Sequence, residues 1–394
     1  MNADQIIDAA RETTGLDDLG DDDLFGGDLW RDGLQVLVTS LDEEAELHDL
    51  GRSIVPGELT AYVVNRLRVV DHHRRHPAIR ERDITPPVVI MGQARTGTTM
   101  LFDLLAQDSD HRVPQTWEVD SPVPPPRTKT YLTDPRIAEA DATFEMVDLV
   151  IPEFRAIHQL GAQLAQEDVR ITGATFASAI FPTQYRVPSY LTWLLHDAQA
   201  NGHIAASYTW HRRYLELLQS EHPGARWLIK TPFHMWTLPE LMAEYPQALL
   251  VQTHRDPARV IASTASLLAT LRRLGSDRIV PAELADEFSE LILDGFERSV
   301  DARLDGTVPA GQIADVSFAQ MMQDPIAAVR SVYDRFGWEL RPETETAMVT
   351  FQREHPREAR GHSYTFADTG LELAAVRERT ARYTAHFAVP EEPS

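Results

Sequence analysis

The stretch from Val88 to Leu101 constrains the fold of this chain more than any other part of the sequence. Four apolar residues end at Met91, and Gly92 and Gly97 then enclose four intervening residues, after which leucines recur at helical spacing. The pattern predicts a strand, a tight loop and a helix. Such a loop aims several backbone N–H groups at one point and adds the positive end of a helix dipole, so we expect it to bind a phosphate or sulfate group.

The residues of this loop argue against a nucleoside triphosphate as its ligand. A P-loop that binds ATP needs a Lys directly after the second glycine to reach the phosphates, followed by a Ser or Thr that holds magnesium. Thr98 occupies that Lys position, and the only cation of the loop is Arg95. The chain also has no obvious run of apolar residues ending in Asp, which such enzymes use for the metal. A metal-dependent P-loop kinase is therefore the weaker alternative.

The charge balance bears on possible partners. With 37 Lys and Arg residues against 60 Asp and Glu residues, the chain of 394 residues has a formal charge of -23. We therefore expect no binding to nucleic acid and no nonspecific attraction to an anionic membrane surface. An anionic ligand must be held by a local cluster of cations.

The cellular compartment is predicted from cysteine usage and from the apolar runs. The sequence has no cysteine, which excludes disulfides and thiolate metal sites and fits a reducing interior. The amino-terminal residues lack the layout of a signal peptide, and no apolar run approaches the roughly 20 residues that a membrane span needs. We expect a cytoplasmic enzyme without integral membrane contact.

Strands and helices alternate around the loop and again in the second half of the chain. Predicted strands at 226–230, 248–253 and 312–317 each precede a helix, as the strand at 88–91 does. This alternation predicts an α/β fold, a P-loop-like three-layer sandwich around a central, mainly parallel sheet. Ligands bind at the carboxyl ends of the strands in such sheets.

Two further segments read as helical. We expect residues 1–85 to form an amino-terminal helical extension and residues 86–394 to form the catalytic domain. Within the latter, the mostly helical segment 131–220 is predicted to be an insertion that shapes the pocket of an acceptor substrate.

The loop resembles one that a known enzyme family uses for a sulfated nucleotide. Arg95-Thr96-Gly97-Thr98-Thr99 is similar to the segment with which bacterial and actinobacterial sulfotransferases bind PAPS (3′-phosphoadenosine 5′-phosphosulfate). The resemblance implies that these residues hold the 5′-phosphosulfate. It also implies that no metal is needed, because Arg95 and the backbone N–H groups do the work that magnesium does in kinases.

A second motif, separate from the loop, resembles the same family. Arg255-Asp256-Pro257 is followed by Ser263, eight residues after the arginine. In sulfotransferases an Arg and a Ser at this spacing bind the 3′-phosphate of PAPS. The resemblance spans roughly residues 86 to 365 and implies a PAPS-dependent sulfotransferase with PAPS as its co-substrate.

Three residues are candidates for the chemical step. Lys230 begins a segment similar to the family's Lys-Ser/Thr-Pro-x-His, and the resemblance assigns it to the sulfuryl oxygens. Glu118 follows a Pro-Gln pair as the catalytic Glu of trehalose sulfotransferases does. His234 resembles the base of cytosolic sulfotransferases, but it lies four residues after the lysine instead of two. We prefer Glu118 as the general base and keep His234 as the alternative.

Two resemblances are looser. Phe318 lies where family members carry a Tyr that contacts the nucleotide, so it keeps the ring and loses the hydroxyl. Arg360 and Gly361 resemble the carboxyl-terminal segment that closes over the 3′-phosphate, and an ordinary surface loop explains them equally well.

The function predicted is sulfuryl transfer to a hydroxyl on a small-molecule, carbohydrate or lipid acceptor. A second hypothesis is a nonenzymatic sensor or scaffold that binds adenosine 3′,5′-bisphosphate without turnover. The sensor would use Arg95, Arg255 and Ser263 but would not need the three candidates for the chemical step. Neither the acceptor nor the oligomeric state follows from the residues.

Overall fold

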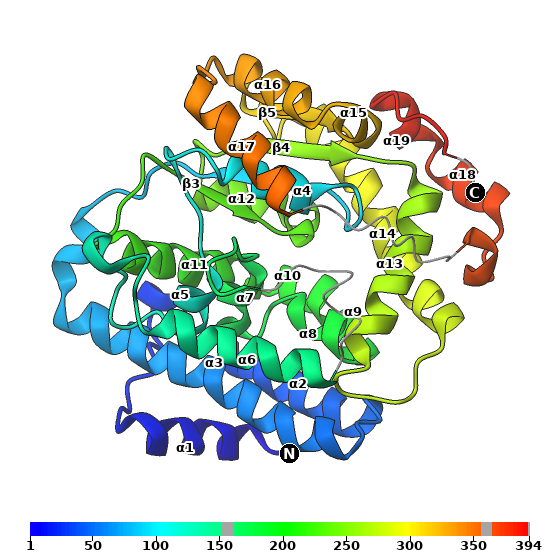
Figure 1. Ribbon diagram of the computed structural model, residues 1–394. Coiled ribbons are helices and arrows are strands. Elements are labelled where there is room, and N and C mark those ends of the chain that lie inside the picture. The colour runs from blue at the N-terminus through cyan, green and yellow to red at the C-terminus, as the bar shows by residue number, and fades with distance from the viewer. Residues whose placement is uncertain (151–160, 356–364, 393–394) are drawn as a thin grey trace. The chain divides into compact units, whose positions relative to one another are not determined.

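The computed structural model describes residues 1–150, 161–355 and 365–392 (Figure 1). The chain forms two compact units. The first contains Met1–Thr85, Pro114–Pro223 and Thr270–Ile279, and the second contains Pro86–Val113, Gly224–Ala269 and Val280–Ser394. Both segments that were predicted to be helical therefore belong to the first unit. The boundary at residue 85 between two domains stays a prediction.

The second unit contains the sheet, and all four predicted strands belong to it. Its strands are β1 (Val88–Met91), β2 (His111–Arg112), β3 (Arg226–Lys230), β4 (Leu249–His254) and β5 (Ile313–Ser317). They lie in the order β2-β3-β1-β4-β5, and every neighbouring pair is parallel. The sequence did not predict β2, because two residues are too few to show a periodicity.

The central strand is buried on both faces. All four residues of β1 are buried, and Val89 lies opposite Ile229 of β3 and Leu250 of β4. A parallel strand covered on both faces reads as a continuous apolar run, which is how Val88–Met91 appears in the sequence. Since β1 is central, the loop that follows it opens at the middle of the sheet.

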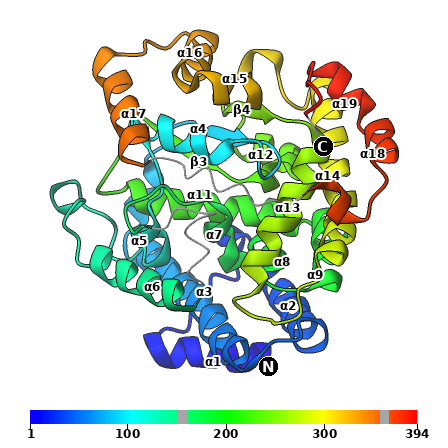
Figure 2. The ribbon, with the colours of Figure 1, turned by 45° about the vertical axis from the view of Figure 1, so that its right-hand side comes forward.

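Helices cover both faces of the sheet, as the three-layer prediction required (Figures 1 and 2). The helices of this unit are α4 (Thr98–Leu105), α12 (Leu238–Glu244), α13 (Pro257–Arg272, whose last three residues count with the first unit), α14 (Pro281–Leu304), α15 (Phe318–Gln323), α16 (Pro325–Phe336), α17 (Pro342–Glu354), α18 (Leu373–Arg379) and α19 (Ala381–His386). The connection through α4 leads from β1 toward β2, at one edge of the sheet. The connections from β3 through α12 to β4, and from β4 through α13 and α14 to β5, lead toward the other edge. Right-handed connections therefore place them on opposite faces. Helices α16 and α17 pack with α4.

The first unit is helical where the structure describes it. Its helices are α1 (Ala3–Thr14), α2 (Trp30–Glu44), α3 (Asp49–Arg75), α5 (Thr116–Asp120), α6 (Arg136–Val150), α7 (Val169–Thr172), α8 (Ile180–Gln184), α9 (Pro188–Leu195), α10 (Asp197–Ala200) and α11 (His203–Gln219). Helix α1 packs against α2 and α3 (Figure 1). Arg66 is buried between the rings of Trp30 and Trp210 and donates to the carbonyl of Leu19 at 2.7 Å, so α3 is tied to the amino-terminal segment.

No described helix combines the length and the apolar composition that a membrane crossing requires.

Candidate active site

The loop between β1 and α4 has a backbone that favours glycine at two positions. The φ angle is 142° at Gly92 and 93° at Gly97, where L-residues with side chains are strained. A Cβ atom at Gly97 would lie 2.0 Å from Cε of Met321, so the loop also needs the missing side chain for space. Arg95 has a φ of 69°, which is uncommon for a residue other than glycine. Glycine is thus strongly favoured at both positions of the turn.

The side chain of Thr96 ties the loop to its surroundings. Its side chain is fully buried, and Oγ1 lies 2.6 Å from the carbonyl oxygen of Gln93 and 2.6 Å from Oγ1 of Thr253 on β4. Gln93 in turn donates to the carbonyl of Ile292 at 2.9 Å. These bonds hold the loop to β4 and to α14, so the first N–H groups of α4 have a fixed direction.

The two predicted anion-binding motifs contact each other directly. Nε of Arg95 donates to Oγ of Ser263 on α13 at 2.8 Å, and Nη1 of Arg255 donates to the carbonyl oxygen of Arg95 at 2.9 Å. Arg255 lies just before α13, which begins at Pro257 as predicted. The motif around Arg255 and Ser263 therefore lies beside the glycine loop.

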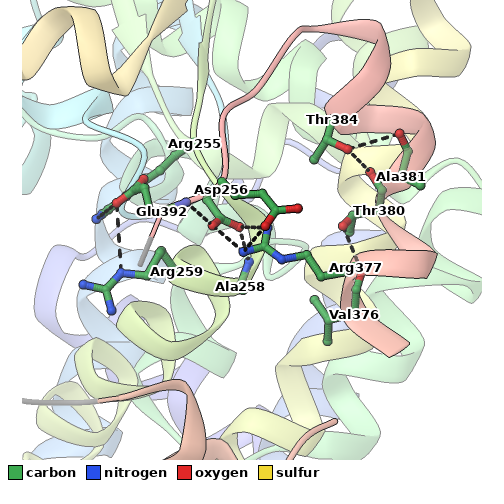
Figure 3. A network of polar contacts seen from close by, with 11 residues as sticks. Arg255, Asp256, Ala258, Arg259, Val376, Arg377, Thr380, Ala381, Thr384 and Glu392 are labelled. Atoms are coloured by element: carbon green, nitrogen blue, oxygen red, sulfur yellow. Dashed lines mark hydrogen bonds and ion pairs between the residues drawn. The ribbon is translucent and has the colours of Figure 1, made fainter. Parts of the chain in front are cut away.

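Arg255 is held on several sides. Its guanidinium carbon lies 3.9 Å from the centre of the Phe318 ring, a distance at which the cation is attracted to the ring face. Its Nε and Nη2 donate to the two carboxylate oxygens of Glu392 at 2.9 and 3.0 Å (Figure 3). The ring of Phe318 therefore packs against the guanidinium of Arg255 in this structure. Whether the same ring also contacts a nucleotide stays a prediction.

The residue before Arg255, His254, is buried and contacts two polar side chains. Nδ1 of His254 lies 3.0 Å from the hydroxyl of Tyr383, and Nε2 lies 2.8 Å from Oδ1 of Asp315. Burial lowers the pKa of His254, although Asp315 opposes the shift. Partial burial alone would raise the pKa of Asp315, but hydrogen bonds from His254 and Arg303 outweigh it and lower that pKa to about 2. The two ring nitrogens of His254 thus tie the end of β4 to Tyr383 and to Asp315.

Lys230 lies at the end of β3 with its side chain almost fully buried. Its Nζ donates to Oγ1 of Thr99, in the first turn of α4, at 3.3 Å and lies 5.7 Å from the centre of the Phe102 ring. The ammonium group is thus directed at the glycine loop. His234 is also buried and lies on the short 3-10 helix η6 (Pro232–Trp236) that follows.

Glu118 belongs to the first unit, where it lies in the first turn of α5. Its side chain is fully buried, and Oε1 accepts from the backbone N–H of Gln115 at 2.8 Å and from the hydroxyl of Tyr131 at 3.1 Å. Together with the side chain of Gln115 it forms a capping box. Glu118 therefore has a local structural task, whatever else it does.

Comparison with known proteins identifies the family to which the chain belongs. A family model described as "Sulfotransferase family" matches residues 86–342, which contain β1 to β5 and the glycine loop. The chain belongs to the sulfotransferase family. The family prediction is thus confirmed, and so is the α/β fold with its parallel sheet.

Solved sulfotransferases resemble the chain over nearly its full length. Sulfotransferase STF1 from Mycobacterium tuberculosis H37Rv is 30% identical, with a TM-score of 0.83 over 97% of this chain and 99% of that one. Sulfotransferase STF9 from Mycobacterium avium is 26% identical, with a TM-score of 0.89 over 100% of this chain and 98% of that one. The amino-terminal helices therefore fall within these matches too.

A curated relative has a more specific name. The omega-hydroxy-beta-dihydromenaquinone-9 sulfotransferase Stf3 of Mycobacterium bovis is 25% identical over 262 residues, which cover 64% of this chain and 63% of that relative. The match thus spans less than two thirds of the relative's length.

Two of the predicted site residues are not addressed by the structure. Arg360 and Gly361 lie outside the described residues. Among the residues that are described, no group of three His, Asp or Glu side chains could hold a metal ion.

The sequence did not predict several residues that support the glycine loop and Arg255. Thr253 and Gln93 fix the loop, and Glu392 contacts Arg255. Thr253 ends a predicted strand, so its position at the sheet edge was a usable signal. Glu392 lies 137 residues after Arg255 in the sequence, and no motif pointed to it.

Proposed function

We propose that this chain transfers the sulfuryl group of PAPS to a hydroxyl on an acceptor molecule. One observation carries the proposal, the contact of Arg95 with both Ser263 and Arg255. A nucleotide with phosphates on its 5′ and 3′ positions needs two anion-binding groups within one ligand's length of each other. The two motifs meet this condition.

The proposed roles follow from the placement of each group. The N–H groups at the start of α4 and the Arg95 guanidinium hold the 5′-phosphosulfate, since a helix N-terminus favours anions. Arg255 and Ser263 hold the 3′-phosphate. Lys230 neutralises charge on the sulfuryl oxygens during transfer, because its ammonium group already points at the loop.

The reaction is a displacement at sulfur. The acceptor oxygen forms a bond to sulfur while the bond between sulfur and the 5′-phosphate oxygen breaks, and adenosine 3′,5′-bisphosphate leaves. The hydroxyl proton goes to a general base, for which we propose Glu118, with His234 as the alternative. A base of this kind contributes about 10²- to 10⁴-fold to such a step.

We propose that the helical segment 131–220 shapes the acceptor pocket and that a lipid-like alcohol is the first acceptor class to test. The name of the Mycobacterium bovis relative specifies a hydroxylated menaquinone. Large apolar side chains in this part of the chain are also strongly exposed, with relative exposures of 72% at Leu132, 61% at Met146 and 78% at Leu149. The absence of cysteine fits the cytoplasmic location that we propose.

Two measurements test the proposed function. Thermal unfolding with adenosine 3′,5′-bisphosphate should show a clear increase in the midpoint, and ATP with magnesium should not, since Thr98 replaces the lysine of ATP-binding loops. A larger shift with ATP would support a kinase instead. Incubation with ³⁵S-labelled PAPS and hydroxylated lipids should then give a labelled product. Bisphosphate binding without any labelled product from lipid, sugar or small-molecule alcohols would favour the sensor.

A further inference from the structure

The carboxyl-terminal residues place a carboxylate on the arginine that we assign to the 3′-phosphate. Glu392 accepts from Nε and Nη2 of Arg255 at 2.9 and 3.0 Å, the paired geometry that arginine forms with carboxylates and phosphates alike (Figure 3). Its Oε2 lies 4.0 Å from Nε of Arg259 on α13. The side chains of Arg255 and Glu392 are 15% and 27% exposed, so water screens this pair only in part.

Glu392 reaches this position because its backbone is fixed. Its N–H donates to Oδ2 of Asp256 at 2.7 Å. Asp256 is fully buried and also accepts two bonds from Arg377 on α18, at 2.7 and 2.8 Å, and one from the N–H of Ala258 at 3.0 Å. These four bonds match the acceptor capacity of a carboxylate. Asp256 thereby links the start of α13, α18 and the segment at Glu392 (Figure 3).

The contacts of Arg255 leave little capacity for a second anion. A guanidinium has five N–H groups, and three of those on Arg255 already donate, two to Glu392 and one to the carbonyl of Arg95. The edge formed by Nε and Nη2 is one that a phosphate would use for two parallel bonds. A phosphate that binds there must displace Glu392 or lie close to its negative charge.

We infer that Glu392 is a built-in competitor for the phosphate site, and that it sets how tightly and how selectively this site takes an anion. A phosphate monoester carries close to two negative charges at neutral pH and can replace a singly charged carboxylate, whereas a singly charged anion gains little by the exchange. The carboxylate thus favours a doubly charged phosphate over singly charged anions at this site, and it lowers the affinity only of nucleotides whose 3′-phosphate must displace it. This inference rests on the proposed function, which assigns Arg255 to that phosphate.

The test compares variants of the full chain that differ in one charge. Glu392→Gln removes the negative charge at nearly constant shape, and Glu392→Ala removes the side chain. Glu391→Gln is the matched control, because Glu391 is 76% exposed and its ion pair is with Arg377, at 3.8 Å. Calorimetry measures the affinities for adenosine 3′,5′-bisphosphate and for adenosine 5′-phosphate, which has no 3′-phosphate. Thermal unfolding without ligand confirms that each variant is folded.

Both Glu392 variants should bind the bisphosphate roughly three- to tenfold more tightly than the unaltered chain, as expected for loss of a partly buried competing charge. Their affinity for adenosine 5′-phosphate and the affinities of Glu391→Gln should stay within about twofold of the unaltered chain. Unchanged or weaker bisphosphate binding in either Glu392 variant, or an equal gain for both nucleotides, would overturn the competitor role and leave the proposed function intact. If the unaltered chain bound no bisphosphate, the competitor role of Glu392 and the proposed function would both be contradicted.

Discussion

Nε of Arg95 lies 2.8 Å from Oγ of Ser263, and this hydrogen bond joins two motifs that are 168 residues apart in the sequence. The contact ties the glycine loop to the polar face of α13. It gives the proposed nucleotide site its central polar contact, and the predictions that follow are tests of the groups around it and of the fold that carries them.

Ser263→Ala should weaken binding of adenosine 3′,5′-bisphosphate. The change removes the acceptor for Arg95 and one proposed donor to the 3′-phosphate, and a hydrogen bond of this kind contributes about 1 kcal/mol, or about fivefold in affinity. Calorimetry measures the change. Ser331→Ala is the control, because the Ser331 hydroxyl donates to the carbonyl of Ala328 on its own helix. Equal affinities for the two variants would contradict the assignment of Ser263.

Gly97→Ala should destabilise the protein and weaken bisphosphate binding. The new Cβ would strain a backbone at a φ of 93° and would lie 2.0 Å from Cε of Met321, so we expect a loss of about 2–4 kcal/mol in the free energy of unfolding. Gly306 has a φ of 83°, but a Cβ there would have no neighbouring atom of the described residues within 4 Å. Gly306→Ala should therefore cost only about 1 kcal/mol. Similar unfolding midpoints for both variants would show that the contact with Met321 does not matter.

Lys230→Met should separate transfer from binding. The methionine keeps an apolar stem in the buried site but removes the ammonium group, so kcat should fall by about 10²- to 10³-fold. Bisphosphate binding should change little, because that product carries no sulfuryl group. The chain has one other lysine, Lys129, and Lys129→Met should leave both quantities unchanged. If bisphosphate affinity fell as much as kcat, Lys230 would be assigned to binding a phosphate of the nucleotide and not to the sulfuryl group.

Glu118→Gln should reduce kcat by at least about 10²-fold while bisphosphate affinity stays the same, if Glu118 is the general base. Glutamine can still accept the hydrogen bonds from Gln115 and Tyr131, so α5 should stay formed. Single-turnover rates with labelled PAPS measure the effect, and His234→Gln serves as the comparison. Retained turnover in Glu118→Gln together with a loss in His234→Gln would assign the base to His234.

The first unit should lose stability in mildly acidic solution because of His73. Burial lowers the pKa of His73 from 6.5 to about 4, since the ring lies among apolar side chains and near Arg213, although Nε2 contacts the carbonyl of Arg213 at 2.8 Å. The unfolded chain takes up this proton first, so the contribution is complete above pH 6.5 and is lost as pH falls toward 4. The slope is at most about 1.4 kcal/mol per pH unit.

Urea unfolding at pH 7 and pH 5 measures this effect. In His73→Gln the loss of stability between the two pH values should be smaller than in the unaltered chain, because the glutamine does not titrate. His196 is exposed on the same unit, and His196→Gln should keep the original pH dependence. The same pH dependence in all three proteins would rule out His73 as the cause.

Local patterns predicted much of the second unit. A short continuous apolar run that ends at a glycine is typical of a buried parallel strand, and two glycines at a strand end permit a turn that other residues resist. β1, the loop and α4 could therefore be predicted from local patterns. Asp256 and Pro257 likewise gave the start of α13. In each case the physical cause lies within a few residues of its effect.

Contacts between distant segments could not be predicted in this way. β2 has two residues and becomes a strand only because Arg226 and Trp227 lie beside it. Arg303 donates to Asp315 and to Gln252, and neither bond follows from the spacing of these residues.

The sequence by itself determined the parallel sheet, the glycine loop and the family, because each is fixed by short-range patterns of size, polarity and backbone freedom. Only the tertiary structure decided which side chains meet. It brought Ser263 within hydrogen-bond distance of Arg95 and stacked Arg255 on Phe318. It also placed Glu392 against the guanidinium of Arg255. The reason is physical: a hydrogen bond or an ion pair depends on distances of about 3 Å, and packing of the whole unit sets those distances.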